Sequence, residues 1–531
     1  MSSSTNRNRT WAVALLTLLV VALAAPAASA QEYYSRRGTS APTEDTTDNT
    51  YAEGLAPVAP PARTGEEVVL ELGDDFAAVV AAHPAGTHFR IAAGVHRGQS
   101  VTPRDGDTFT GDAGAVLDGT VPLRAGDFSR SGGVWVAAGQ TAEAFVHNGR
   151  FHGSTEDGFE RHAANNDLWN GDTRLNHVNS RGEVDSPDEW FFDYERDEVV
   201  VGVDPASASL SLSVPWHAFR SEATGVTVQH VTVTRYGSYA QHGAIHAQGH
   251  GWTVRHTTVT ENHGGGVLIG PFGTLSHSRI TANGQIGVTA WYGEGIVVDS
   301  NEIAHNRTLQ YRLGWEAGGT KFKETTGMVF SNNWVHHNDG TGIWFDIDNR
   351  DSVIRSNLAE DNLIGVNIEI SYGAEISDNT IRDNGAEGYG DIGAGIWVSN
   401  SSNVEIHHNE IADNRLDILA THYERGAGAH GRYETHGLDV HHNHIRITGE
   451  KPTGLRVYTG EDHFYTERGN TFRDNTYDLS EAGTTFWWQG DRSWDQWQAL
   501  GFDVNGSFAA AGNGSTGVRT PYAPVGYGHA A

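Results

Sequence analysis

The chain has 531 residues, which is more than one ordinary domain holds unless a repeat architecture extends a single domain. It contains no cysteine, so no disulfide stabilises it and a large hydrophobic core has to do so. The formal net charge of −30 repels polyanions at long range, so we expect no nucleic-acid partner.

The N-terminal segment has the features of a secretory signal. Arg7 and Arg9 form a basic start, residues 11–25 are almost wholly apolar, and Ala28-Ser29-Ala30 is a small-residue cleavage site. Residues 1–30 are therefore predicted to be a signal peptide. No later apolar stretch is long enough to span a membrane, so the sequence predicts a secreted, extracellular protein.

Four further regions follow in chain order. Residues 31–64 lack any apolar period and are rich in Pro, Thr, Ser and Ala, which predicts a disordered linker. Residues 65–124 are predicted to form an N-terminal cap and the first coils, with a capping helix in DDFAAVVAAHP (74–84). Residues 125–215 break the repeat described below and are predicted to be an inserted β-rich lobe, with a hairpin in WFFDYERDEVVVGVDP (190–205).

A short apolar segment recurs along the next part of the chain. Examples are WTVRHTTVTENH, MVFSNNWVHHND and AEISDNTIRDNG. The third residues of the aligned segments are 228, 254, 275, 298, 330, 354, 376, 406 and 440, so the shorter gaps cluster near 22 to 24 residues. The longer gaps, such as those before 330 and 440, correspond to one repeat plus an insertion. This period is typical of a solenoid.

Asparagine and glycine mark the corners of each repeat. Two asparagine series are in register: Asn301, Asn333, Asn357, Asn379, Asn409 and Asn443 in one, and Asn262, Asn283, Asn306, Asn338, Asn362, Asn384 and Asn414 in the other. Asn tolerates the left-handed conformation of sharp corners, and its amide can bond to the same residue one coil away. A third strand starts after a glycine in each repeat, as at Gly319, Gly342 and Gly365.

Three short strands per repeat of about 23 residues predict an all-β fold, a single-stranded right-handed parallel β-helix with an N-terminal capping helix and an inserted lobe. Residues 216–450 form its predicted core. Residues 451–531 are predicted to supply the C-terminal coils and a cap, with the aromatic-rich WWQGDRSWDQWQALGF (487–502) as the closing segment.

GIWFDIDN (342–349) presents an unusual outer face. Read as one strand, it points Ile343, Phe345 and Ile347 inward, and points a tryptophan and two carboxylates outward. The residues two and four positions after each glycine predict two outward rows: Thr289, Lys321, Trp344, Asn367 and Trp397, and Trp291, Lys323, Asp346, Glu369 and Ser399.

Five residues of this face are candidate catalytic groups: Glu316, Lys321, Lys323, Asp346 and Glu369. Asp346 and Glu369 are equivalent positions on neighbouring coils, so we expect their α-carbons about 5 Å apart. Two carboxylates at that separation raise one pKa, as a general acid requires. The lysines, one coil away, either lower a carboxylate pKa or act as a base when desolvated.

Aromatic residues and one arginine are candidate substrate-binding groups. The insertion YRLGWEAGGTKFKE (311–324) is predicted to bring Arg312, Trp315 and Glu316 to the edge of the rows. Flat rings beside carboxylates suit the binding of sugar rings. The predicted substrate-binding residues are Trp291, Arg312, Trp315, Trp344, Tyr372 and Trp397.

Two other interpretations of the same residues stay open. Asp346, Asp348 and Glu369, helped by Asn349, offer oxygen ligands that suit Ca²⁺, although no DxDxDG spacing is present. Alternatively, the charges simply solvate an exposed strand and form weak surface ion pairs. Most of the 28 histidines follow the corners and are interpreted as structural, while His246 is placed at the end of the same groove.

EAGGTKF, TGIWFDIDN and GVNIEISYGAEISDNTIRDNG resemble a bacterial family of secreted right-handed parallel β-helix proteins of pectin-lyase-like type. The similarity extends over roughly residues 65–450. It implies the fold, which hosts lyases, hydrolases, epimerases and noncatalytic proteins.

These observations predict a secreted enzyme that cleaves an extracellular polysaccharide in a groove on the β-helix face. Hydrolysis would use two of Glu316, Asp346 and Glu369. β-Elimination would use Lys321 or Lys323 as base against a uronate. The alternatives are a noncatalytic glycan-binding or cell-surface protein and a polysaccharide C5-epimerase. We expect a monomer with no obligatory cofactor, apart from the Ca²⁺ considered above.

Overall fold

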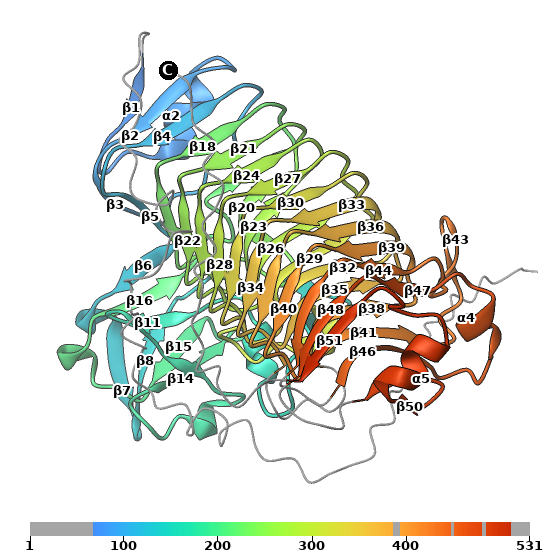
Figure 1. Ribbon diagram of the computed structural model, residues 1–531. Helices are drawn as coiled ribbons and strands as arrows, with labels where there is room; N and C mark the ends of the chain where they lie inside the picture. The colour runs from blue at the N-terminus through green and yellow to red at the C-terminus, as the bar shows by residue number, and fades with distance from the viewer. Residues whose placement is uncertain (1–66, 386–392, 448–450, 480–484, 511–531) are drawn as a thin grey trace, which may run out of the picture. The chain divides into compact units, whose positions relative to one another are not determined.

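The computed structural model describes residues 67–385, 393–447, 451–479 and 485–510. The predicted signal peptide (1–30) and the whole of the predicted linker (31–64) lie outside these residues. Most of the described chain winds into coils whose strands stack into three long sheets, A, B and C (Figure 1). This confirms the predicted all-β right-handed parallel β-helix.

Sheet A contains β1 (Val68–Leu70), β2 (His88–Ile91), β4 (Thr108–Gly111), β18 (Thr227–Gln229), β21 (Thr253–Arg255), β24 (Thr274–Ser276), β27 (Val297–Asp299), β30 (Val329–Ser331), β33 (Arg350–Arg355), β36 (Tyr372–Ser377), β39 (Ser402–His407), β44 (Asp439–His441) and β47 (Thr471–Arg473). Sheet B contains β3 (Gly94–Arg97), β5 (Ala115–Asp118), β19 (Thr232–Thr234), β22 (Thr258–Thr260), β25 (Arg279–Thr281), β28 (Glu302–Ala304), β31 (Trp334–His336), β34 (Leu358–Glu360), β37 (Thr380–Arg382), β40 (Glu410–Ala412), β45 (His444–Ile447), β48 (Thr476–Leu479) and β51 (Ser507–Ala510).

Sheet C contains β17 (Phe219–Arg220), β20 (Gly243–Ala247), β23 (Gly265–Ile269), β26 (Ile286–Trp291), β29 (Gly318–Lys323), β32 (Thr341–Asp346), β35 (Ile364–Glu369), β38 (Ala394–Ser399), β41 (Leu416–His422), β46 (Lys451–Val457), β49 (Phe486–Trp488) and β50 (Asp491–Arg492). The residues aligned in the sequence repeat form one inward row of sheet A: Val228 pairs with Val254, Phe330 with Ile354, and Ile406 with Val440. All of them are fully buried, so the stack of coils is the core.

Both asparagine series form continuous ladders, as predicted. In the second series, the Asn338 side-chain amide donates to Asn362 Oδ1 at 3.0 Å, and Asn362 donates to Asn384 Oδ1 at 3.2 Å. This packing explains why a glycine stands near the start of these strands of sheet C. A Cβ on Gly342 would lie 2.9 Å from the Asn362 amide, so a side chain there would displace the ladder.

The ends of the solenoid are closed by helices and aromatic residues. Helix α2 (Phe76–Ala82) begins at Asp75, whose carboxylate accepts from the Ala78 N–H, and it buries Phe76 and Val80. At the other end, α5 (Trp494–Ala499) buries Trp497. The first asparagine ladder continues through Asn475 and ends on Asp503, an acceptor that also receives hydrogen bonds from the Tyr477 hydroxyl and the Trp497 indole. The other two α-helices of the described residues, α3 (Leu313–Glu316) and α4 (His463–Thr466), are single turns.

A second group of strands forms the inserted lobe and begins at β6, slightly before the predicted boundary. Its two larger sheets contain β6 (Thr120–Leu123), β11 (Leu168–Asn170), β12 (Thr173–Arg174) and β16 (Leu210–Ser213), and β7 (Phe128–Ser131), β8 (Val134–Ala138), β13 (Asn176–His177), β14 (Glu189–Asp193) and β15 (Glu198–Val201). The predicted hairpin is present as the antiparallel pair β14–β15. A short hairpin, β9 (Val146–His147) with β10 (Arg150–Phe151), completes the lobe, together with the 3₁₀ turns η3 (Ala125–Asp127), η4 (Glu160–Ala163), η5 (Arg181–Glu183) and η6 (Pro205–Ser207).

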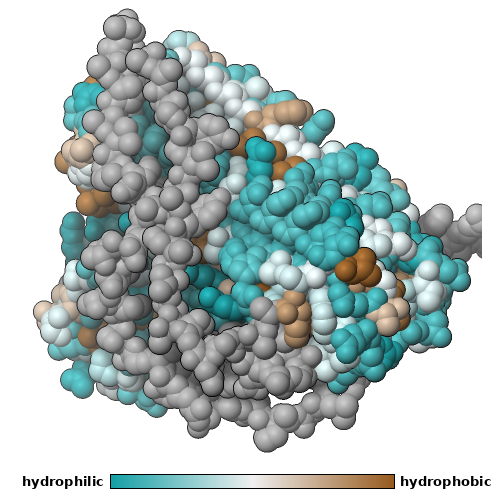
Figure 2. Space-filling view, in the orientation of Figure 1, coloured by the Kyte–Doolittle hydropathy of each residue, from teal (hydrophilic) through white to brown (hydrophobic). Residues whose placement is uncertain are grey.

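The surface over the middle of the solenoid is polar. Hydrophilic residues predominate over the middle coils in the face that Figure 2 shows. Among the described residues, no helix has the length and apolarity needed to cross a membrane.

We predict that Asn362→Ala lowers the free energy of unfolding by about 2–4 kcal/mol, because it leaves several buried donors and acceptors of the ladder without partners. Urea denaturation followed by circular dichroism measures the change. Asn505→Ala, at an exposed asparagine outside the ladders, is the control and should alter stability by less than about 0.5 kcal/mol. Equal losses for the two variants would contradict a stabilising ladder.

Candidate functional site

The middle strands of sheet C carry the residues predicted to form the outward rows. Strand pairing places Thr289 opposite Lys321, Trp291 opposite Lys323, Trp344 opposite Asn367, Asp346 opposite Glu369, and Asn367 opposite Trp397. The register is the one that the glycines predict. It brings side chains from β26, β29, β32, β35 and β38 onto one face.

Lys321 lies at the centre of this face and is buried. Its Nζ is 2.8 Å from Asp346 Oδ2 and 3.5 Å from Glu316 Oε1. The same ammonium lies 3.9 Å from the centre of the Trp344 ring, a cation–π contact that strengthens when water is excluded. The structure therefore brings together four of the predicted site residues, all of them buried.

Glu369 lies beside this group and reaches the surface. Its side chain is 13% exposed, and Oε1 is 2.9 Å from the guanidinium of Arg425. Arg425 comes from the segment after β41, so it approaches from two coils away. Glu369 therefore faces the Asp346 carboxylate along the sheet and a guanidinium at its outer side.

The pKa shifts follow from these contacts. Burial and the negative charge of Asp346 raise the pKa of Glu369, and these effects exceed the opposing influence of Arg425 and Lys321. Burial lowers the pKa of Lys321, but the Asp346 and Glu316 carboxylates outweigh it, so the pKa of Lys321 is raised overall. At neutral pH Lys321 is therefore a cation, and Glu369 holds a proton more tightly than an ordinary glutamate does.

Several buried polar atoms along the two rows have no hydrogen-bond partner among the described residues. They are Thr289 Oγ1, Trp344 Nε1, Asp346 Oδ1, Asn367 Oδ1 and Ser399 Oγ. Buried polar groups of folded proteins are nearly always satisfied. A path of unsatisfied donors and acceptors on one face of a sheet fits the binding of a ligand rich in hydroxyl groups.

The insertion before β29 lies against the lobe. Arg312 pairs with Asp157 of the lobe at 2.5 Å and not with the charges around Lys321. Trp315 makes an edge contact with His152, with ring centres 5.8 Å apart, and its carbonyl lies 3.4 Å from the ammonium of Lys321. The insertion thus supplies Glu316 and a carbonyl oxygen to the site, whereas Arg312 anchors the loop.

Asp348 departs from the single-strand interpretation of GIWFDIDN. β32 ends at Asp346, and Ile347 and Asp348 have positive φ angles of 63° and 56°, so they form a corner and Ile347 is not a core residue. The Asp348 carboxylate accepts from the Tyr433 hydroxyl at 3.0 Å and from the Ala429 N–H at 3.2 Å.

These partners belong to a hairpin, β42 (Ala427–Gly428) with β43 (Gly431–Arg432). Tyr372 also contacts this hairpin through its hydroxyl, which donates to the Gly431 carbonyl. Tyr372 therefore supports the hairpin.

The three predicted calcium ligands have separate partners. Asp346 pairs with Lys321, Asp348 accepts from the hairpin, and Glu369 pairs with Arg425. Two of the three carboxylates thus already face cationic side chains. These residues do not form the converging set of oxygens that Ca²⁺ requires.

The remaining aromatic residues differ in exposure. Trp344 is only 5% exposed and lies under Lys321, so it is not an open platform. Trp397 is partly buried, and its indole donates to Thr421 Oγ1. Trp291 makes an edge contact with His242 and lies 5.5 Å from the Lys323 ammonium.

His246 lies in the same outward row, one strand before Leu268 and two before Thr289. It is buried and stacks on His242 with ring centres 4.8 Å apart. Burial lowers the pKa of His246 to about 4, so its imidazole is neutral at physiological pH.

Comparison with known proteins agrees with the geometry. A family model described as a right-handed beta helix region matches residues 243–392. The matched region is less than a third of the chain, and it lies within the right-handed parallel β-helix that the structure shows.

Among solved structures, a complex of XylC with xylose aligns with a TM-score of 0.58 and 13% identity, over 76% of this chain and 80% of that one. The A-module of the Azotobacter vinelandii mannuronan C-5 epimerase AlgE4 aligns with a TM-score of 0.44 and 14% identity, over 78% and 92% of the two chains. The Agl-KA catalytic domain aligns with a TM-score of 0.44 and 13% identity, over 86% of this chain and 70% of that one. A search of curated protein sequences found no significant match.

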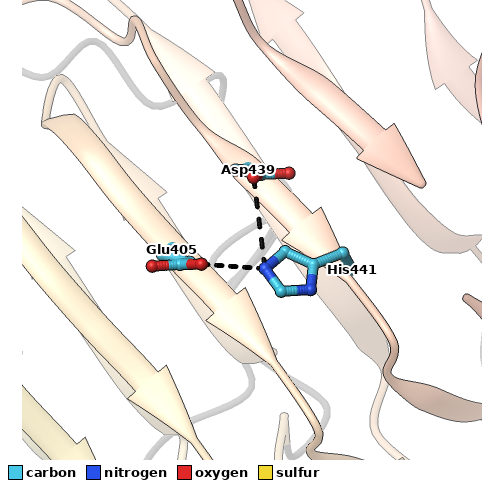
Figure 3. Close-up of side chains that lie close together, drawn as sticks. All are labelled: Glu405, Asp439 and His441. Atoms are coloured by element: carbon cyan, nitrogen blue, oxygen red, sulfur yellow. Dashed lines mark hydrogen bonds and ion pairs between the residues drawn. The ribbon is translucent and has the colours of Figure 1, made fainter. Parts of the chain in front are cut away.

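The described part of this β-helix protein contains one compact group of carboxylates and an imidazole that suits a metal ion: Glu405, Asp439 and His441. His441 lies on β44 and points toward both carboxylates (Figure 3). Asp439 also pairs with Arg473 at 2.7 Å, and the group lies on the outer face of sheet A. It therefore forms an ion-pair ladder apart from the Lys321 site.

Arg425 and Tyr433 were missed by the sequence analysis. The 34-residue gap between 406 and 440 indicates an insertion, but its length does not reveal that the inserted hairpin contacts Asp348 three coils back. An arginine in a Gly-rich insertion (ERGAGAHGR, 424–432) next to an acidic row is the signal that was available.

We predict that Glu369→Gln changes the pH dependence of stability. Because the pKa of Glu369 is raised above its unfolded value of 4.5, the folded state keeps a proton that the unfolded state releases, and stability falls as the pH rises through this interval. The variant cannot ionise, so its free energy of unfolding relative to the unmodified protein should increase from pH 4 to pH 7. Urea denaturation of both proteins at pH 4 and at pH 7 measures this difference in the free energy of unfolding. Glu195→Gln, at an exposed lobe residue, should show no such trend, and a flat difference for Glu369→Gln would contradict the raised pKa.

Proposed function

We propose that the protein is an enzyme that hydrolyses glycosidic bonds with retention of configuration, using Asp346 as nucleophile and Glu369 as general acid and base. The observation that carries the proposal is the pairing of these two residues on adjacent strands. The strand spacing of about 4.8 Å is close to the separation of about 5–5.5 Å between the two carboxyl groups of retaining glycosidases.

Glu369 has the properties of the acid. Burial and the neighbouring Asp346 charge raise its pKa, which favours the protonated form that a general acid needs, and its position at the rim lets it reach the oxygen of a leaving group. After the first step the same residue, now a carboxylate, accepts a proton from the water that attacks the glycosyl ester. Arg425 then faces a full negative charge and stabilises it.

Asp346 has the properties of the nucleophile. Oδ2 is held by the Lys321 ammonium, while Oδ1 is buried and has no hydrogen-bond partner among the described residues, so the side chains that cover it have to move before a sugar reaches it. Attack of Oδ1 on the anomeric carbon breaks the bond to the leaving oxygen, which takes the proton of Glu369. Hydrolysis of the resulting ester restores the Asp346 carboxylate.

The charges favour hydrolysis over β-elimination. Elimination needs a neutral base near the proton to be removed, but the raised pKa of Lys321 keeps that side chain an ammonium. Lys323 directs its ammonium toward the rings of Trp291 and Tyr292. Elimination also requires a uronate, which the net charge of −30 repels.

The likeness to XylC, whose structure holds xylose, supports a sugar as ligand of this fold. The buried hydroxyl and amide atoms along the rows are groups that would bind sugar hydroxyls. We further propose that the enzyme is exported and acts as a monomer on an extracellular polysaccharide, because residues 1–30 have the pattern of a secretory signal.

We predict that Asp346→Asn abolishes the release of reducing ends and that Glu369→Gln lowers it by about 10²–10⁴-fold. The assay follows reducing ends and absorbance near 235 nm over a panel of neutral and uronate polysaccharides. Proton NMR of early products should show the retained anomer. Asp378→Asn makes the same chemical change at an exposed corner of sheet A and should keep full activity.

Other outcomes of this assay separate the alternatives. Absorbance at 235 nm that accompanies the reducing ends would identify a lyase. Full activity of Asp346→Asn would remove that residue from the mechanism. Binding of a polysaccharide with no product of either kind would indicate a noncatalytic glycan-binding protein or an epimerase.

A further inference from the structure

A corner of the solenoid carries two exposed aromatic residues in a strained conformation. Phe272 follows β23 and Tyr292 follows β26, and they are 47% and 66% exposed. Both have φ = +53°, the left-handed region that bulky residues rarely adopt. Asn or Gly would fit such a corner at lower cost, so two aromatic residues here indicate a function that needs exposed rings.

The Phe272 and Tyr292 rings lie on successive coils, and hydrogen bonds to the following coils hold the backbone of each residue. The Phe272 N–H donates to the Glu294 carbonyl on the next coil, and the Tyr292 N–H donates to the Lys323 carbonyl on the coil after that. The Phe272 ring packs on Gly295, where an added Cβ would lie 2.9 Å from Cδ1. His250 adds a third ring, centred 4.6 Å from that of Phe272. The rings therefore line one edge of the solenoid at the coil spacing of about 4.8 Å.

A surface cavity of about 510 Å³ runs along this edge. Its lining includes His250, Phe272, Tyr292, Glu294, Glu324 and Asp348. At its far end lie Ala429 and His430 of the hairpin that holds Asp348. The cavity crosses several coils, so its shape suits an extended chain.

The charges of the cavity define what chain it accepts. The Glu294 and Glu324 carboxylates have no ion-pair partner among the described residues. The protein as a whole is strongly acidic. A polyuronate would be repelled, whereas neutral sugar hydroxyls donate to such carboxylates while the sugar faces pack on the aromatic rings.

We propose that this edge is a second binding surface, in which Phe272 and Tyr292 hold a neutral polysaccharide chain. Tyr292 directly follows Trp291, and Lys323 lies within 6 Å of both rings. A chain held on this edge therefore passes next to the Asp346–Glu369 pair. The inference rests on the proposed function for the kind of ligand, but not on catalysis.

The test measures binding without turnover, in the Asp346→Asn protein, by affinity gel electrophoresis in neutral xylan, mannan or hydroxyethyl cellulose and in polygalacturonate or alginate. We expect retardation by at least one neutral polymer and none by the polyuronates. Phe272→Asn with Tyr292→Asn, which suits a left-handed corner, should weaken the binding constant by at least 10-fold. Leu500→Asn, at a 46% exposed apolar residue elsewhere, is the matched control and should not change it.

Every outcome of this experiment either supports or overturns the proposed second binding surface. Unchanged affinity of the double variant, tighter binding of a polyuronate, or no binding of any neutral polymer would overturn the inference, whether or not the unmodified enzyme is active. Binding that depends on Phe272 and Tyr292 supports it, even if the unmodified protein releases no product and the proposed hydrolysis fails. Melting temperatures of all variants, which should stay within a few degrees, exclude unfolding as the cause of lost binding.

Discussion

The vertical register of the coils is the constraint on which the rest of the structure depends. Two ladders of buried asparagine amides bond successive coils from Asn262 and from Asn301 onward, and each amide also satisfies backbone carbonyls at the corner. A slip of one residue would bury the wrong face of every strand and break both ladders at once. Because the register is this strict, side chains about 23 residues apart in the chain are fixed as neighbours one strand spacing apart.

Because the register is fixed, charged side chains can be buried against one another on the outward face of sheet C. An isolated Lys321 would cost several kcal/mol in a dry environment. Here the register sets Asp346 beside it, the insertion adds Glu316, and Trp344 provides a ring beneath the ammonium. Three negative groups, including Glu369, surround one buried lysine. Burial and the negative charge of Asp346 raise the pKa of Glu369, while Asp346 itself is paired with Lys321.

The sequence predicted those features that depend on the repeat alone. The coil period, the asparagine ladders and the pairing of Asp346 with Glu369 are one-dimensional properties, since position within a coil determines position on the face. Features that depend on departures from the repeat were not predictable. Asp348 was assigned to a strand that ends two residues earlier, because nothing in IDN distinguishes a corner from a continuing strand. Arg312 was assigned to the site, but its partner Asp157 lies in the lobe, more than 150 residues away in the chain.

The insertions explain how a uniform scaffold acquires a single distinct site. In the part of the chain that the structure describes, three departures from the repeat meet around Lys321: the loop with Trp315 and Glu316, the hairpin after β41, and the lobe. The lobe is joined to the loop through His263, which contacts both Asp167 and the Tyr311 hydroxyl. The repeat thus determines where carboxylates lie, while the insertions determine which of them are desolvated. The proposed chemistry is therefore placed on the few coils on which long-range contacts converge, while the stacked coils around them fix Asp346 and Glu369 on adjacent strands.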